Sequence, residues 1–197
     1  LVGHSLGYGY YYTLESGKPL KDSEIKTLEA EMRRLVAEDI PIATKFIAYE
    51  EAAELFEKLR LSETREQLNY IATPSVRINT LGDFSDMYFG PLVLSTGILK
   101  VFALMQYKEG FLLRFPKSGT PERLPKFEDQ PKLFEIYRRY KSWGKQLGVM
   151  SAASLNRLIN NRKADEFIDI TETLQEKCIA DIGDQIAESK KVRVVLI

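Results

Sequence analysis

The side chains with the clearest chemical potential lie in one glycine-bounded stretch, GDFSDMYFGP, at residues 82–91. Asp83 and Asp86 stand three residues apart there, and Tyr88 follows. Two carboxylates and a phenol can line a pocket and bind an amine or a hydroxyl group. The alternative is a loop whose aspartates accept hydrogen bonds from nearby backbone N–H groups. Tyr88 could likewise bond a ligand through its hydroxyl or fill a pocket with its ring.

A run of tyrosines near the N-terminus supplies further candidates. The run consists of Tyr8, Tyr10, Tyr11 and Tyr12. Such rings can stack on a base or a ribose. In a strand, alternate rings fill the core and cover the sheet instead. Tyr10 and Tyr12 are therefore added to the three loop residues as candidate pocket residues, and no residue is assigned a catalytic role.

Histidine and cysteine are too scarce to support a metal site. His4 is the single histidine and Cys178 the single cysteine, whereas a zinc site usually needs three or four ligands. We therefore expect no metal ion and no cofactor in this chain. One cysteine cannot form a disulfide within the chain, which suits a reducing, cytoplasmic setting. Cys178 lies on the apolar stripe of a predicted helix, where a free thiol packs as a small hydrophobic group.

The charge balance argues against a dedicated nucleic-acid binder. Lys and Arg total 28, as do Asp and Glu, so the formal net charge is zero. One local patch, RRYKSWGK at residues 138–145, interleaves cations and rings that could contact RNA phosphates. The alternative is a helix C-terminus, where cations suit the helix dipole. No stretch approaches the ~18 apolar residues of a membrane span, and the N-terminal residues do not resemble a secretory signal.

An α+β fold with a mostly antiparallel sheet should position these residues. The patterns predict strands over residues 5–14 and 41–49, and a strand from residue 74 that ends in the glycine-marked loop. A hairpin with Gly110 in its turn is predicted over residues 98–116. Helices are predicted over residues 22–39, 50–59, 62–71, 132–147, 151–161 and 164–190. Predicted N-caps are Asp22 or Ser23, Ser62, and Ser151.

The composition divides the chain into three parts. Residues 1–115 form the α+β part, and residues 116–131 carry four prolines and read as a linker or extended arm. Residues 132–197 form a helical segment that ends in VRVVLI, a run typical of a buried parallel strand. We interpret this segment as the approach to an α/β domain of a longer protein.

Three stretches together resemble the editing-type second domain of threonyl-tRNA synthetases. They are GYGYYYTL with the following helix and strand, EEAAELF, and GDFSDMYFGPLVLSTGILKVFALM, in that order over residues 5–115. The family loop reads Asp-Leu/Met-Cys-Arg-Gly-Pro-His. Asp86, Gly90 and Pro91 match it, whereas Tyr88, Phe89 and Leu92 stand in the Cys, Arg and His positions.

These replacements bear on the chemistry that the resemblance implies. Hydrolysis of a mischarged aminoacyl ester needs a positioned water, a base and groups that hold the substrate. Leu92 can neither coordinate a metal nor transfer a proton. The family's two other histidines would lie on a helix before residue 1. We therefore expect an accessory or ligand-binding domain, with an RNA 3′ end or an amino acid as its possible ligand, rather than an editing hydrolase.

The C-terminal part resembles a second family, the uridine-kinase-like proteins. In that family a long helix and a strand such as KKVRVVLI precede a glycine-rich loop that holds ATP phosphates. Some members carry a synthetase-like region before the kinase. The resemblance implies a longer protein that uses a nucleoside, ATP and Mg²⁺, with this chain as its non-catalytic N-terminal part. A free-standing editing hydrolase and a pure interaction module are the alternatives.

Overall fold

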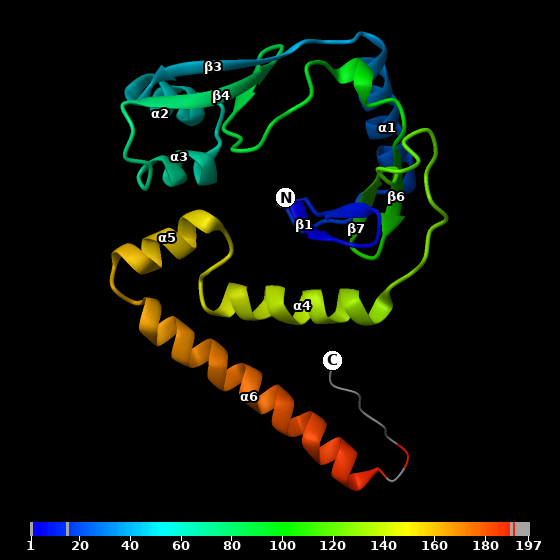
Figure 1. Ribbon diagram of the computed structural model, residues 1–197, viewed down its shortest axis with the longest axis vertical. Coiled ribbons are helices and arrows are strands. Elements are labelled where there is room, and N and C mark those ends of the chain that lie inside the picture. Colours follow the sequence, from blue (N-terminus) through cyan, green and yellow to red (C-terminus); the bar gives the residue numbers. More distant parts are fainter. Residues whose placement is uncertain (1, 15, 190, 192–197) are drawn as a thin grey trace. The chain divides into compact units, whose positions relative to one another are not determined.

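The computed structural model describes residues 2–14, 16–189 and 191 of the chain (Figure 1). It divides into two compact units, Leu1–Trp143 and Gly144–Ile197. The expected boundaries at residues 115 and 131 therefore both lie inside the first unit. The reason is that the start of the following helix packs into the core of that unit.

The elements alternate between strands and helices in the first unit and are all helical in the second. The strands are β1 (Val2–Ser5), β2 (Gly9–Tyr12), β3 (Ile42–Ala48), β4 (Ser75–Leu81), β5 (Phe84–Asp86), β6 (Ala103–Tyr107) and β7 (Gly110–Arg114). The helices are α1 (Asp22–Ala37), α2 (Tyr49–Lys58), α3 (Ser62–Leu68), α4 (Pro131–Gln146), α5 (Ala152–Asn160), α6 (Ala164–Glu188) and the 3₁₀ turn η1 (Thr96–Ile98).

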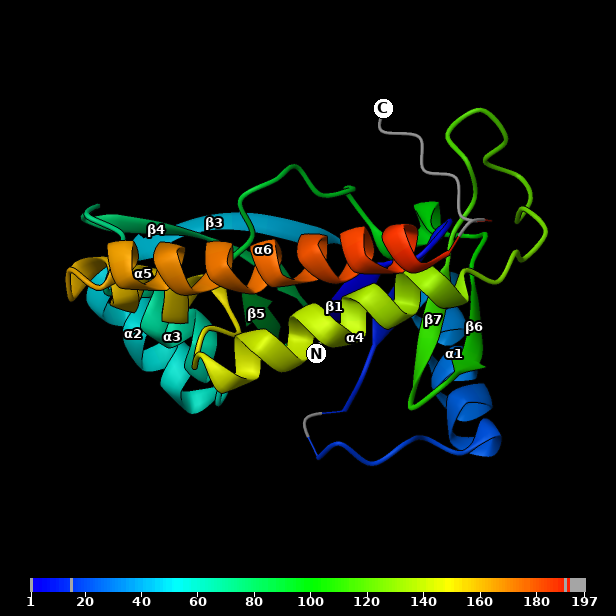
Figure 2. The ribbon, with the colours of Figure 1, turned by 90° about the horizontal axis from the view of Figure 1, so that it is seen from below.

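The first sheet has four antiparallel strands in the order β1-β2-β7-β6. The strand expected over residues 5–14 is present but shorter, as β2, because Gly7 adopts a positive φ of 58° and turns β1 back onto β2. Gly9 behaves as expected, since a Cβ there would lie 3.1 Å from the carbonyl oxygen of Leu113 on β7. Helix α1 packs beside β6 (Figure 2).

An aromatic cluster forms the core beneath this sheet. Its buried members are Leu6, Tyr11, Tyr107, Leu112 and Phe134. The Phe134 ring of α4 meets Tyr11 and Tyr107 edge-on at 5.0 Å and 5.2 Å between centroids. Edge-to-face pairs of this kind add to the stabilisation from buried area. They fix α4 to the sheet, which explains why the first unit extends past residue 131.

The proline-rich segment at residues 116–131 is anchored rather than a free linker. Phe127 packs against the aromatic cluster, with its ring 6.0 Å from that of Tyr107. The Tyr107 hydroxyl donates to Asp129 Oδ1 at 2.5 Å, and Arg114 donates to the carbonyl oxygen of Pro125. Of the two interpretations, an extended arm describes this segment better than a linker, and the sequence did not reveal that a partly buried ring, Phe127, anchors it.

The second sheet has three antiparallel strands in the order β3-β4-β5. Helices α2 and α3 lie on one of its faces (Figure 1). Their buried residues Ala52, Phe56 and Leu68 pack against Val76 and Ile78 of β4. Strand β5 was not expected; residues 82–86 were interpreted as loop. The α+β class is confirmed, but as two small antiparallel sheets instead of one.

The helix ends follow the predictions only in part. Ser151 caps α5, because its hydroxyl accepts from the Ser154 N–H at 3.3 Å. The caps predicted at Asp22 or Ser23 and at Ser62 are wrong, since all three residues are already helical. At α1, Glu24 reaches back to accept from the Lys21 N–H at 2.7 Å, so a carboxylate replaces the expected cap.

Helices α5 and α6 make up most of the second unit. The predicted positions of both are confirmed. The last strand, expected at residues 192–197, lies outside the described residues, and every strand pair among the described residues is antiparallel. In the described part of the chain, no helix combines the length and apolar character needed to cross a membrane.

Candidate functional site in the β4–β5 hairpin and the following loop

A tight hairpin positions the two candidate aspartates. Leu81 pairs with Phe84, so Gly82 and Asp83 form a two-residue turn, and Gly82 has the positive φ of 56° that such a turn requires. Asp83 lies exposed at the tip of this turn. Asp86 lies at the end of β5, opposite Asn79 of β4. Asp83 thus lies in the turn, whereas Asp86 lies at the far end of β5. Their closeness in the sequence alone does not make the two carboxylates one site.

Asp86 holds two elements together. Its Oδ1 accepts from the Thr64 hydroxyl of α3 at 3.0 Å and from the Met87 N–H at 2.7 Å. Hydrogen bonds to a carboxylate are about twice as strong as neutral ones. The bonds join the start of the candidate loop to α3. The local backbone role that the sequence left open is thus present, together with a tertiary contact that no spacing revealed.

The loop after Asp86 carries unusually exposed apolar side chains. Tyr88 is 53% exposed, Phe89 73% and Leu94 81%. The Tyr88 ring lies over Gly90, where a Cβ would be 3.1 Å from its Cε1 atom. Tyr88 therefore presents its ring and hydroxyl at the surface and does not fill buried space. Leu92 is also exposed, at 40%.

Polar residues of β4 lie near this loop, and one of them forms a hydrogen bond with its backbone. Arg77 Nη2 donates to the carbonyl oxygen of Gly90 at 2.8 Å. Asn79 is 7% exposed, and its Nδ2 donates to the Thr44 hydroxyl at 3.5 Å. Arg77 Nε and Asn79 Oδ1 are buried and have no hydrogen-bond partner. Buried polar atoms are normally paired, so these two mark a site where a donor and an acceptor remain available.

Sequence reasoning missed Arg77 and Asn79. The signal was the alternation in SVRINTL, which puts both on the face of β4 opposite Val76 and Ile78. Polar residues at alternate positions ordinarily indicate a solvated face. Only the structure shows that Asn79 is buried and that Arg77 bonds the backbone of the loop.

Tyr10 and Tyr12 lie on the other sheet, in β2. The Tyr12 ring stacks on Phe111 at 5.4 Å, and burial raises the pKa of its hydroxyl. Tyr10 is 44% exposed and lines an apolar groove of about 740 Å³ with Met32, Leu35 and Phe102. None of the three loop candidates lines this groove. The five candidate residues thus fall into two groups, one on each sheet.

His4 and members of the basic patch at residues 138–145 contact neighbouring side chains. The His4 ring stacks on Tyr137 at 5.3 Å, and Tyr140 meets Trp143 edge-on at 5.1 Å. Arg138 of the basic patch lies 3.5 Å from Glu109. Within the described ranges, no group of three or more His, Cys, Asp or Glu side chains could hold a metal ion.

With this geometry in view, the chain can be compared with known proteins. It is an α+β protein with an exposed aromatic loop over a partly unsatisfied polar layer. No family model matches it. Threonine–tRNA ligase of Paraburkholderia phymatum is 27% identical over 159 residues, which cover 75% of this chain and 25% of the relative. The Lawsonia intracellularis threonine–tRNA ligase is 31% identical over 104 residues, covering 53% and 16% respectively.

The chain is therefore distantly similar to a portion of threonine–tRNA ligases. It spans about a quarter or less of the length of these relatives. A stretch that covers 75% of a 197-residue chain includes residues 116–131 wherever it begins. The similarity thus extends past residue 115, in agreement with the anchoring of the proline-rich segment to the first sheet. These comparisons reveal no kinase relative among the proteins named.

Proposed function

We propose that the first unit is a non-hydrolytic binding domain that takes the 3′ end of an RNA at the loop after β5. The observation that carries this proposal is the exposed pair Tyr88 and Phe89 above the unpaired polar atoms of Arg77 and Asn79. Unstacked bases bind proteins by stacking on aromatic rings and by hydrogen bonds to their edges. The relatives, as their name states, act on a transfer RNA and threonine, which supports an RNA end as the ligand.

The same loop argues against ester cleavage. Asp86 already accepts two hydrogen bonds through Oδ1, which fixes its position near Thr64. Tyr88, Phe89 and Leu92 occupy the positions of Cys, Arg and His in the resembled family. A phenyl ring and an isobutyl group supply neither a base nor a metal ligand. We infer a site that retains shape and contacts but has no group suited to activate water.

Two measurements on the full chain test this proposal. The first is fluorescence anisotropy of a labelled single-stranded RNA. Replacing Tyr88 and Phe89 by Ala should weaken binding about tenfold, since stacking is worth ~1–3 kcal/mol per base. Leu28→Ala is the control, because Leu28 is 37% exposed on α1 and lies outside both the loop and the second sheet; it should leave the affinity unchanged.

The second measurement is the release of serine from mischarged threonine transfer RNA. We expect release at the spontaneous rate. Faster release that depends on Asp86 would identify an editing hydrolase and overturn the non-hydrolytic proposal. If RNA does not bind at all, or the loop variant and the control lose affinity equally, the loop is not an RNA site and a pure interaction module is the better description.

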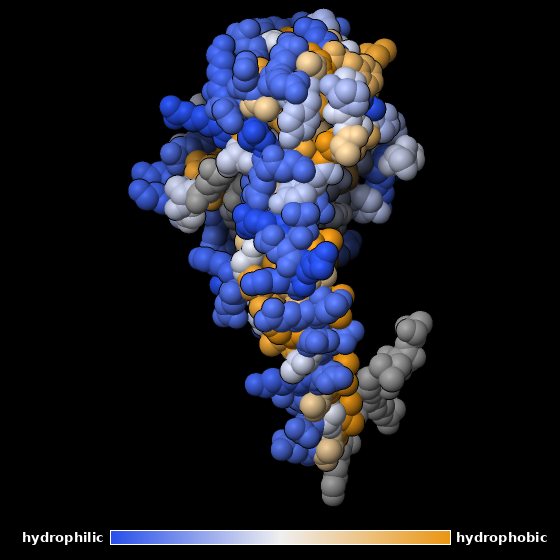
Figure 3. Space-filling model, turned by 90° about the vertical axis from the view of Figure 1, so that its left-hand side faces the viewer, coloured by the Kyte–Doolittle hydropathy of each residue, from blue (hydrophilic) through white to orange (hydrophobic). Residues whose placement is uncertain are grey.

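We further propose, for the longer protein, a nucleoside kinase that uses ATP and Mg²⁺. Support comes from α6, whose 25 residues include no buried side chain among those described. Exposed Ile168, Ile170, Ile179, Ile182 and Ile186 lie along it (Figure 3). Such a helix suits packing against a further domain. Nucleoside-dependent ATP hydrolysis or transfer by the intact protein tests this proposal, and its absence would remove the kinase assignment.

A further inference from the structure

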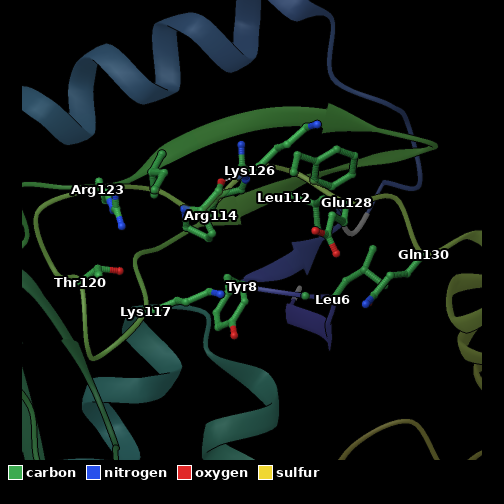
Figure 4. A pocket seen from close by; sticks show the side chains of 14 residues that line it. Leu6, Tyr8, Leu112, Arg114, Lys117, Thr120, Arg123, Lys126, Glu128 and Gln130 are labelled. Carbon is green, nitrogen blue, oxygen red and sulfur yellow. Dashed lines mark hydrogen bonds between the residues drawn. The ribbon is translucent and has the colours of Figure 1, made fainter.

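A second pocket, on the four-stranded sheet, has five charged residues among the fourteen that line it. It has a volume of about 660 Å³ and is enclosed by the β1–β2 turn, the end of β7 and the segment from Lys117 to Gln130 (Figure 4). Its charged and aromatic lining residues include Tyr8, Arg114, Lys117, Arg123, Lys126 and Glu128. A volume of this size accommodates a small molecule.

The charges in this pocket are strongly unbalanced. Four cations face one carboxylate, Glu128. In the described part of the chain, none of the four lies within 4 Å of a carboxylate oxygen. By contrast, Arg33, Arg34 and Arg65 all form ion pairs. Several unpaired cations around one concave surface create a positive potential that attracts an anion.

The pocket is held in shape before any ligand arrives. The Arg114 guanidinium lies 5.5 Å from the centre of the Phe127 ring and donates to Pro125. The Phe115 N–H donates to the carbonyl oxygen of Tyr8 at 3.0 Å. These contacts tie the two walls of the pocket to the sheet. A ligand therefore need not order the proline-rich segment, which lowers the entropic cost of binding.

Besides its charges, the pocket has one exposed aromatic ring and one side-chain amide with an unpaired oxygen. Tyr8 is 45% exposed, and no ring among the described residues stacks on it. The Lys117 ammonium lies 4.7 Å from the centre of this ring (Figure 4). The Oε1 atom of Gln130 is buried without a hydrogen-bond partner. The first feature suits a planar group with a nearby negative charge, and the second suits an N–H donor.

We propose that this pocket binds a nucleotide, with its phosphate near Lys117, Arg114 and Arg123, and its base against Tyr8. The base supplies the planar face and an N–H donor for Gln130, and the phosphate supplies the negative charge. The site is separate from the loop after β5 and does not depend on the function proposed for that loop. The nucleotide can be a free one or part of a single-stranded RNA.

Calorimetric titration of the full chain tests the site with four probes: inorganic phosphate, AMP, ATP and a short single-stranded RNA. The double variant Lys117→Glu with Arg123→Glu reverses two exposed charges of the pocket. It should lower the affinity for AMP or RNA at least tenfold. Lys45→Glu with Lys58→Glu makes the same charge change on exposed residues outside the pocket, and should change the affinity less than threefold.

A third variant separates the base from the phosphate. Tyr8→Leu should weaken AMP severalfold and leave inorganic phosphate unchanged. In the Tyr88→Ala, Phe89→Ala background, where the loop does not contribute, tighter binding of RNA than of AMP and ATP identifies a strand as the ligand of the pocket, whereas the reverse identifies a free nucleotide. Tyr88→Ala with Phe89→Ala should leave the AMP and ATP titrations unchanged, which distinguishes this site from the loop.

Three results would overturn the proposal. One is no binding of AMP, ATP or RNA with a Kd below about 1 mM. Another is an equal loss of affinity in the pocket variant and its charge-matched control, which would indicate a diffuse field. The third is inorganic phosphate binding as tightly as AMP and insensitive to Tyr8, which would indicate an anion site with no place for a base.

Discussion

Tyr107 shows how one side chain can tie the proline-rich segment to the sheet and make stability depend on pH. Burial, as the larger cause, and the hydrogen bond to the Asp129 carboxylate together raise the pKa of its hydroxyl to about 12. The raised pKa means that the fold favours the neutral phenol. Its contribution to stability is therefore present below pH 10 and is lost as the pH rises from 10 towards 12.

Replacing Tyr107 by Phe should reduce the alkaline loss of stability, and the part that remains comes from Tyr11, Tyr12 and Tyr137, whose pKa values are also raised. At neutral pH the variant should be about 1 kcal/mol less stable, because Asp129 loses a donor. Thermal unfolding at a series of pH values measures both effects. Tyr140→Phe is the control, since Tyr140 is 56% exposed and should leave the profile unchanged. An unchanged alkaline slope in the Tyr107 variant would contradict the assignment.

The sequence identified some of the candidate residues but not the residues that form hydrogen bonds with them. Asp86 was identified from its loop, yet Thr64, which binds it, lies 22 residues earlier on another element. Gln130 carried no signal, and the alternation that places Arg77 on the polar face of β4 ordinarily indicates a residue that faces water. The pairing of atoms distant in sequence, rather than residue type, decides which polar groups remain unsatisfied.

The sequence pattern around Gly110 predicted the hairpin correctly but assigned the wrong role to the glycine. The β6–β7 hairpin was predicted with Gly110 in its turn, but the turn consists of Lys108 and Glu109, and Lys108 adopts the positive φ of 51°. Gly110 is the first residue of β7. A Cβ there would lie 2.1 Å from the Tyr12 carbonyl oxygen, so the close approach of β2 explains the glycine.

Gly110→Ala should therefore destabilise the first unit strongly. Backbone cannot yield as a flexible side chain does, and overpacking of this kind costs about 1–3 kcal/mol or more. Gly119→Ala is the matched control, because nothing lies within 4 Å of its added Cβ and its φ is not positive; it should be neutral or slightly stabilising. Urea unfolding of both variants measures the difference in their stability. Equal midpoints would show that β2 and β7 can separate without cost.

The two sheets could not be distinguished from sequence because strand patterns do not specify strand partners. Both β2 and β3 were expected in one antiparallel sheet, yet β2 pairs with β7, about a hundred residues later, and β3 pairs with β4. The helix between β2 and β3 packs beside β6. Helix positions were predicted well because their periodicity is local, whereas sheet membership depends on contacts far apart in sequence.

The two units should differ sharply in local stability. Both hydrophobic clusters draw their members from residues between Leu6 and Tyr137, whereas no described residue of α6 is buried. An isolated helix gains little from propensity and depends on packing of its apolar face. Hydrogen exchange should therefore be slow for the amides of β2, β4 and β7, and fast along most of α6. Mass spectrometry after timed deuterium labelling measures this directly.

Protection of α6 equal to that of β4 would show that its isoleucines are already covered in the chain as it stands. Slow exchange of α6 that appears only in a longer protein of the kind proposed above would instead identify α6 as the docking surface for the proposed further domain, because that domain would then bury its isoleucines.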